Sequence, residues 1–153
     1  MKTGTKSIIM MYAEDDPEDR MLLKDAWEES DLSDELHFVE DGEALMDYLY
    51  RRGKYTELRG QPLPGLILLD LNMPKKDGRE ALGEIKGDPT LRRIPVVVLT
   101  TSGEEEDIIR SYDMGVSGYI IKPVTFESLL EMIKGVSKYW FEIVELPPQG
   151  TGG

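Results

Sequence analysis

The sequence of 153 residues contains no cysteine and a single histidine, His37. Without cysteine, a disulfide framework, a thiolate nucleophile and a cysteine-based metal site are all excluded. One histidine is too few for a metal site built on imidazoles, and we expect His37 to be structural. Apolar runs such as Leu66 to Leu69 fall far short of the ~18 residues of a membrane span, and no signal-peptide stretch opens the chain. We therefore expect a soluble, cytoplasmic protein.

Positive charge is also scarce. The chain carries 18 Lys and Arg against 30 Asp and Glu, a formal net charge of -12 at pH 7. Such a field repels phosphate backbones and anionic lipid, so neither nucleic acid nor membrane is expected among its partners. By contrast, 40% hydrophobic residues and a length of 153 residues are typical of one globular domain with a buried core.

Short apolar segments alternate along the chain with stretches of helical spacing, such as Phe126 to Val136. Four segments are continuous, as strands buried on both faces are, and a weaker fifth alternates like an edge strand. They are Ile8 to Ala13, Leu66 to Leu69, Ile94 to Leu99 and Tyr119 to Ile121, and then Glu35 to Glu40. The alternation predicts an α/β fold with a doubly wound, five-stranded parallel sheet and helices on both faces.

Several helix starts are marked by capping residues. The expected caps are Asp16 before Pro17, Asp41 before Gly42, and Asp77 before Gly78. Ser102 and Glu105 have the spacing of a capping box. Asp16 is therefore assigned to a helix cap and not to the site described below.

Two segments stand outside the regular alternation. Residues Arg51 to Gly65 form a long polar connection that predicts an extended helix end followed by a surface loop. Residues Tyr139 to Gly153 begin with an aromatic and aliphatic cluster and end in glycine and threonine, and we expect the last few residues to lack fixed structure.

Polar residues follow the predicted strands at the edge where a parallel sheet gathers its ligands. Glu14 and Asp15 follow the first strand, Asp70 the third, Thr100 the fourth and Lys122 the fifth. Three carboxylates within ~4 Å of one another repel by roughly 1–4 kcal/mol a pair, so they need a cation. Magnesium suits this set, because it takes one or two carboxylates together with a phosphate.

The same residues predict phosphoryl transfer to a carboxylate. Asp70 is the expected nucleophile, because a carboxylate forms an aspartyl phosphate when a metal neutralises the incoming charge. Lys122 pairs with a phosphoryl oxygen, and the Thr100 hydroxyl donates to another. These contacts to phosphoryl oxygens would distinguish the phosphorylated protein from the unphosphorylated one.

Together these residues, extended by Asn72 after Asp70 and by Tyr119 and Pro123 around Lys122, resemble the signature of response-regulator receiver domains of two-component signalling. The resemblance runs from about Ile8 to about Tyr139, which gives a receiver domain at 1–139 and a C-terminal extension at 140–153. It implies a flavodoxin-like receiver fold with strand order 2-1-3-4-5 and five helices. It also implies that a histidine kinase phosphorylates Asp70.

The resemblance further implies residue roles. Mg²⁺ is held by Glu14, Asp15, Asp70 and the backbone carbonyl of Asn72, with Glu14 in place of the more usual aspartate. Thr100 and Tyr119 switch together, and the peptide bond from Lys122 to Pro123 is cis. The protein is expected to be a phosphoacceptor that assists its own phosphoryl transfer and dephosphorylation, not an enzyme.

A narrower resemblance is to the small stand-alone regulators paired with bacterial and cyanobacterial phytochrome kinases. It depends on Arg51 to Gly53, Leu99 to Ser102 and the apolar tail from Trp140 to Pro147. That tail must be covered either by its own fold or by a partner. We expect a homodimer built from the helix after Ser102, the strand at Tyr119 to Ile121, the helix at Phe126 to Val136, and the tail.

Two alternatives remain. The chain is a degenerate receiver that only binds proteins, although no acid and no lysine of the signature is missing. Or it is a magnesium-dependent phosphatase with an aspartate nucleophile, of the haloacid dehalogenase type. That type needs Asp-x-Asp, and Asn72 stands where the second carboxylate would act as general acid.

Overall fold

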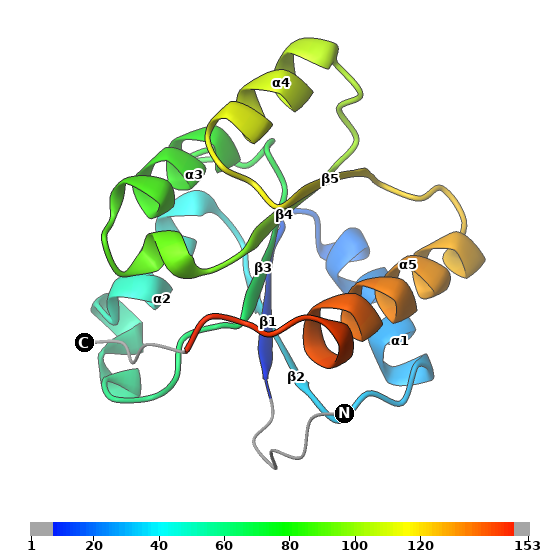
Figure 1. Cartoon of the computed structure of the whole chain (residues 1–153), viewed down its shortest axis with the longest axis horizontal. Coiled ribbons are helices and arrows are strands. Elements are labelled where there is room, and N and C mark those ends of the chain that lie inside the picture. Colours follow the sequence, from blue (N-terminus) through cyan, green and yellow to red (C-terminus); the bar gives the residue numbers. More distant parts are fainter. Residues whose placement is uncertain (1–7, 149–153) are drawn as a thin grey trace.

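The computed structural model describes residues 8–148. Five strands form one parallel sheet in the order β2-β1-β3-β4-β5, which confirms the predicted topology (Figure 1). The strands are β1 Ile9–Ala13, β2 Glu35–Val39, β3 Leu66–Leu69, β4 Val96–Thr100 and β5 Gly118–Ile121. The helices are α1 Pro17–Glu29, α2 Gly42–Tyr50, α3 Gly78–Gly87, α4 Glu105–Asp113 and α5 Phe126–Lys138. The expectation for the last few residues, 149–153, lies outside the described part of the chain.

The central strands bury side chains on both faces of the sheet, because successive residues of a strand point to opposite sides. One apolar layer joins Met11, Ile67 and Val98 to α2 and α3, and the other joins Met10, Leu68 and Leu99 to α1 and α5. The two helix pairs lie on opposite sides of the sheet in Figure 1, and α4 lies beside β5. Burial on both sides explains why these strands appear as continuous apolar runs.

Three of the four predicted helix starts are confirmed. Asp16, Asp41 and Asp77 each accept a hydrogen bond from a backbone N–H of the first helical turn, at 2.9, 2.7 and 3.0 Å. The capping box at Ser102 is wrong, because α4 begins only at Glu105 and the Ser102 hydroxyl donates to Asp107 at 2.8 Å.

The connection after α2 differs from its prediction. The helix ends at Tyr50, and residues Gly53–Leu58 form a short 3₁₀ helix, η1. Arg51 is fully buried, which was not expected of a surface loop. Its guanidinium donates to the carbonyls of Tyr48 and Pro62, both at 2.9 Å, and lies over the Tyr48 ring. Backbone acceptors from the helix end and the loop thus pair both terminal nitrogens of this buried cation, whereas its Nε is buried without a hydrogen-bond partner among the described residues.

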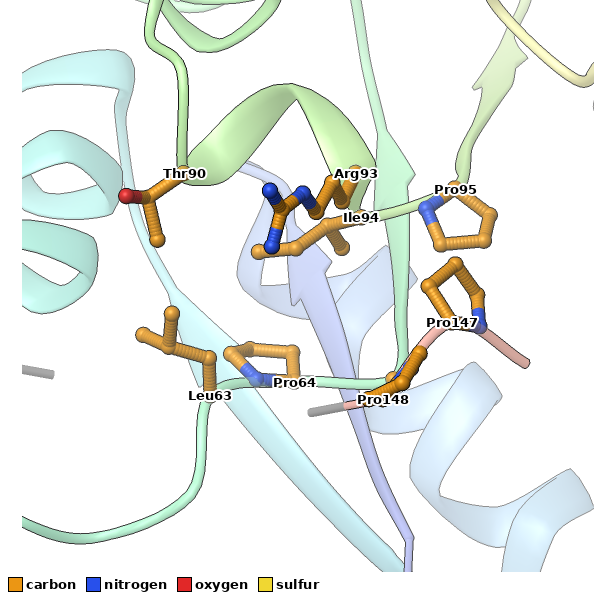
Figure 2. Close-up of a pocket in the computed structure, with 9 residues that line it drawn as sticks. Leu63, Pro64, Thr90, Arg93, Ile94, Pro95, Pro147 and Pro148 are labelled. Carbon is orange, nitrogen blue, oxygen red and sulfur yellow. The ribbon is translucent and has the colours of Figure 1, made fainter. Parts of the chain in front are cut away.

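The C-terminal segment packs largely against its own fold. Residues Tyr139–Ile143 form one turn of π-helix, η3, that turns Phe141 into the layer between the sheet, α1 and α5. Pro147 and Pro148 then lie against Pro64 and Pro95, just before the amino ends of β3 and β4 (Figure 2). Ile143 stays 62% exposed.

Two further points concern the described residues 8–148. Every peptide bond among them is trans, so the expected cis bond before Pro123 is wrong, and this bond has the isomer that most X–Pro bonds adopt. None of the helices in that range is both long and apolar enough to cross a membrane.

Gly78, the first residue of α3, sits against the chain that leaves β3. Its N–H donates to the Leu71 carbonyl at 2.9 Å, and a Cβ placed on it would lie 2.1 Å from the Asp70 carbonyl oxygen. That oxygen is backbone and cannot swing away. The start of α3 can therefore approach Asp70 this closely only with glycine at position 78.

Gly78→Ala is expected to lower the free energy of unfolding by about 2–3 kcal/mol, because the backbone at Asp70 must shift to admit the methyl group. Gly87→Ala, at the other end of α3, is the control: no atom lies within 4 Å of its added Cβ. Urea unfolding of both variants measures the difference. Equal midpoints would show that the close approach at Gly78 does not exist.

Candidate phosphoacceptor site

The sequence-predicted residues meet at the carboxyl edge of the sheet. Glu14 and Asp15 directly follow β1, Asp70 follows β3, Thr100 ends β4, and Lys122 follows β5. The strand ladders continue past the strands: Asp70 N–H donates to the Ala13 carbonyl at 3.1 Å, and Lys122 N–H to the Thr100 carbonyl at 2.8 Å. Backbone hydrogen bonds therefore fix where these side chains start.

Three carboxylates share this edge. Oxygens of Glu14, Asp15 and Asp70 all lie within 4.8 Å of one another. Glu14 and Asp70 are buried, at 1% and 4% exposure, whereas Asp15 is exposed. Buried like charges at this spacing are stable only with a cation beside them.

Lys122 supplies one such cation. Its ammonium donates to Asp19 at 2.7 Å, to Asp70 Oδ2 at 3.1 Å, and to Glu14. Burial by itself would lower the pKa of Lys122, but the hydrogen bonds to Asp19 and Glu14 and the charge of Asp70 raise it above its ordinary value. The ammonium therefore stays charged, with its three donors directed at three carboxylates.

Glu14 is held on all sides. The Tyr12 hydroxyl donates to Oε1 and the Asp16 backbone N–H to Oε2, both at 3.1 Å, and the Arg20 guanidinium donates to the Glu14 backbone carbonyl at 2.6 Å. Burial raises the pKa of Glu14, against the opposing effect of Lys122. Burial and the nearby Glu14 also raise the pKa of Tyr12, which keeps its hydroxyl a donor.

The two oxygens of Asp70 have different partners. Oδ1 accepts from the Thr100 hydroxyl at 2.9 Å and from the Asn72 N–H at 3.0 Å, while Oδ2 faces Lys122. Tyr119 contacts none of the site carboxylates through its hydroxyl in the described structure; the hydroxyl donates to the Ser102 carbonyl at 2.9 Å. Thr100 thus contacts Asp70 directly, whereas the Tyr119 hydroxyl contacts Ser102 and not the site carboxylates.

Asp19, in the first turn of α1, is a site contact that was not among the residues predicted from the sequence. Its position four residues after Asp15 was the available signal, because one helical turn after a strand end brings the chain back over that end. Asp16, by contrast, caps α1 as predicted.

The donor set is chemically suited to a hard divalent cation. Carboxylate oxygens from three residues meet at one edge, and one of the residues, Asp15, faces solvent. Mg²⁺ prefers such oxygen ligands and retains part of its water shell, which an exposed ligand allows.

Comparison with known proteins agrees with this geometry. Residues 10–134 match the response regulator receiver domain family. The response regulator Rcp1 of Synechocystis sp. is 45% identical over 139 residues, which cover 91% of this chain and 92% of that protein.

Solved structures show the same likeness. The phosphorylated cyanobacterial phytochrome response regulator RcpA superimposes with a TM-score of 0.85 at 44% identity, covering 93% of this chain and 99% of that one. The Mn²⁺-bound form of Rcp1 gives a TM-score of 0.82 at 44% identity, with 92% and 99% covered.

Lys122→Met is expected to lower the free energy of unfolding by about 3 kcal/mol without divalent cations, because the buried carboxylates lose their partner. Adding Glu14→Gln should recover part of that loss by removing one facing charge. Lys134→Met, at an exposed position of α5, is the control and should change stability by less than ~0.5 kcal/mol. Chemical unfolding at neutral pH in a chelator measures all three, and equal losses for Lys122→Met and Lys134→Met would contradict the assignment.

Proposed function

Because the chain belongs to the response regulator receiver family, we propose that it accepts a phosphoryl group on Asp70 from a histidine kinase and thereby changes its protein contacts. The observation that carries this is the arrangement around Asp70: a buried carboxylate with the Lys122 ammonium 3.1 Å from one oxygen and the Thr100 hydroxyl 2.9 Å from the other. The proposed nucleophile, the Asp70 carboxylate, thus has a cation at one oxygen and a neutral hydrogen-bond donor at the other.

The reaction is an in-line transfer in which a carboxylate oxygen of Asp70 forms a bond to phosphorus and the bond from phosphorus to the imidazole nitrogen of a phosphohistidine breaks. The imidazole leaves with the bonding electron pair. Transfer of this kind needs positioning and charge neutralisation more than covalent machinery. Lys122 supports the added charge on the phosphoryl oxygens, and Thr100 donates a hydrogen bond. The protein is then a phosphoacceptor that assists its own phosphorylation and dephosphorylation, not an enzyme.

Mg²⁺ is the proposed cofactor, held by Glu14, Asp15, Asp70 and the backbone carbonyl of Asn72. When bound, the ion neutralises charge on the transferring phosphoryl group. The cluster of three carboxylates supports this proposal, as does the Mn²⁺-bound form of the similar Rcp1. The surrounding residues orient the carboxylates toward one point, and for Glu14 the Tyr12 hydroxyl and the Asp16 N–H do this by hydrogen bonding to its two oxygens.

The proposed switch runs through Thr100 and Tyr119. The Thr100 hydroxyl now donates to Asp70, and a phosphoryl oxygen would offer it a new acceptor. Movement of Thr100 reaches Tyr119 through Ser102, whose carbonyl accepts from the Tyr119 hydroxyl.

The proposed partner is a histidine kinase, and the similarity to RcpA and Rcp1 favours one that belongs to a phytochrome. In this proposal residues 1–139 form the receiver domain and 140–153 the extension. The net charge of -12 favours protein partners over nucleic acid.

We also propose a homodimer through α4, β5, α5 and the tail. Large apolar side chains are exposed along this face, namely Ile109, Tyr112, Ile121, Tyr139 and Ile143. Such a patch is covered when two copies meet about a two-fold axis, which places the same residues on both sides.

Asp70→Asn is expected to abolish phosphorylation, because an amide is a poor nucleophile. The protein is incubated with acetyl phosphate and Mg²⁺, and intact mass is measured. Asp16→Asn, which keeps the helix cap, is the control and should still gain one phosphate. Wild type should gain none in a chelator. No gain by wild type with Mg²⁺ would favour a silent protein-binding module, and a gain by Asp70→Asn would place the acceptor elsewhere.

Ile121→Glu is expected to convert the proposed dimer into a monomer, because it places two buried charges face to face at a two-fold interface. Met21→Glu, a change of the same type at a 65% exposed position of α1, outside the proposed interface, should leave the dimer intact. Ile143→Glu tests the tail without unpacking the buried Phe141. Light scattering with and without phosphorylation measures the mass, and a wild-type monomer in both states would refute the dimer.

A further inference from the structure

Polar contacts join Asp70 to α4 beyond the residues that the proposed chemistry uses. The Thr100 hydroxyl oxygen, which donates to Asp70, lies 3.5 Å from the Ser102 N–H nitrogen. The Ser102 hydroxyl in turn donates to Asp107 Oδ2 at 2.8 Å. Ser102 is therefore linked to the site on one side and to α4 on the other.

Asp107 is held from α3 by Arg79. The guanidinium donates from Nε to Oδ1 at 3.0 Å and from a terminal nitrogen to Oδ2 at 2.9 Å, the two-pronged geometry that fixes both groups in one orientation. The side chains are 34% and 17% exposed, so water screens the pair only in part. The hydrogen bonds from Arg79 lower the pKa of Asp107, and the same pairing raises the pKa of Arg79.

The contacts close into a ring. The remaining terminal nitrogen of Arg79 lies 3.4 Å from the Leu71 carbonyl and 3.5 Å from Asn72 Oδ1, on the chain that directly follows Asp70. Within the ring, Ser102 contacts Thr100, Asp107 and, through its carbonyl, Tyr119. Fixing Ser102 therefore restrains both residues of the proposed switch.

Little else anchors this region. Of the nine residues of α4, all of them described, only Ser111 is buried. A helix with so little buried apolar surface depends on polar contacts for its position. The other ion pair of α4, from Arg110 to Glu106, joins two residues of the same helix that are 66% and 77% exposed, and it ties α4 to nothing else.

We propose that Arg79 and Asp107 form a latch that holds Ser102, and with it Thr100 and Tyr119, in the unphosphorylated arrangement. The proposal rests on the phosphoacceptor function proposed above. Moving the Thr100 hydroxyl from Asp70 Oδ1 to a phosphoryl oxygen displaces the chain at Ser102, and this displacement strains the contacts of Asp107 with Arg79. Straining the latch costs free energy, and this cost is subtracted from the free energy that the phosphoryl group gains by binding the Thr100 hydroxyl. Arg79 and Asp107 are positioning residues, because neither touches the reacting atoms.

Beryllofluoride with Mg²⁺ tests the latch, because it forms a stable mimic of the phosphoryl group on a carboxylate. Asp107→Asn and Arg79→Gln should each bind it about fivefold more tightly than wild type, the lower end of the usual range for coupled sites. The double variant should gain no more than either single one, since both remove the same pair. Glu106→Gln and Arg110→Gln, which break the exposed pair on the same helix, should bind as wild type does.

Hydrogen exchange of the amides from Ser102 to Glu106, without beryllofluoride, gives the second measurement. It should accelerate in Asp107→Asn and Arg79→Gln and stay unchanged in the Glu106 and Arg110 variants. Arg79→Lys keeps the charge but not the two-pronged geometry, so it should fall between wild type and Arg79→Gln in both measurements. This variant also serves if a neutral substitution fails to fold.

The outcomes are distinct. If wild type binds beryllofluoride and the latch variants bind equally or more weakly, the latch is wrong and the phosphoacceptor function stands. If wild type itself does not bind, the phosphoacceptor function fails and the latch fails with it. Faster exchange with tighter binding in the two variants, and in neither control, supports the latch.

Discussion

The ammonium of Lys122 is the interaction on which the carboxyl edge of this sheet depends. A parallel sheet gathers its strand ends, and here they bring Glu14 and Asp70 into a buried position where two negative charges repel. Lys122 reaches them from the end of β5 and has Asp19 of α1 as a further partner. One cation therefore connects β1, β3, β5 and α1 at the point where the proposed phosphoryl group would bind. The Lys122 ammonium thus stabilises the fold and would also contact the phosphoryl group.

That arrangement prepares Asp70 for a change of charge. Its Oδ1 is held by two donors, the Thr100 hydroxyl and the Asn72 N–H, while its Oδ2 has the ammonium of Lys122. A hydroxyl and an ammonium on a flexible stem can both follow a phosphoryl oxygen, whereas a backbone N–H cannot move far. The Asn72 N–H therefore holds Asp70 in place, whereas the Thr100 hydroxyl and the Lys122 ammonium can change position when Asp70 is modified.

Sequence reasoning succeeded where one local pattern determines the outcome. Runs such as Leu66 to Leu69 predict strands because both faces are buried, and Asp16, Asp41 and Asp77 predict caps because their oxygens meet the N–H groups of the first turn. The site residues came together because parallel strands end at one edge. It failed where a distant partner decides. Asp19 is a site contact only because Lys122 arrives from a strand 103 positions away, and Ser102 caps no helix because its hydroxyl is directed to Asp107. Arg51 is buried because carbonyls of the following loop return to it, which spacing alone does not reveal.

The uneven anchoring of the helices follows from the same sheet. Helices α1, α2, α3 and α5 all contribute buried apolar side chains to the two layers, and their positions are set by packing that tolerates little displacement. Helix α4 lies beside β5 and buries only Ser111 among its nine described residues, so its position depends on directional polar contacts (Figure 1). Polar contacts of this kind have alternatives of similar energy, in water or on another acceptor, whereas a packed layer has none. Displacement of α4 and of the loop after β4 therefore leaves the core intact. Under the proposed function, a signal generated at Asp70 can change the surface beside β5, where Ile109, Tyr112 and Ile121 are exposed, while the two apolar layers keep their packing.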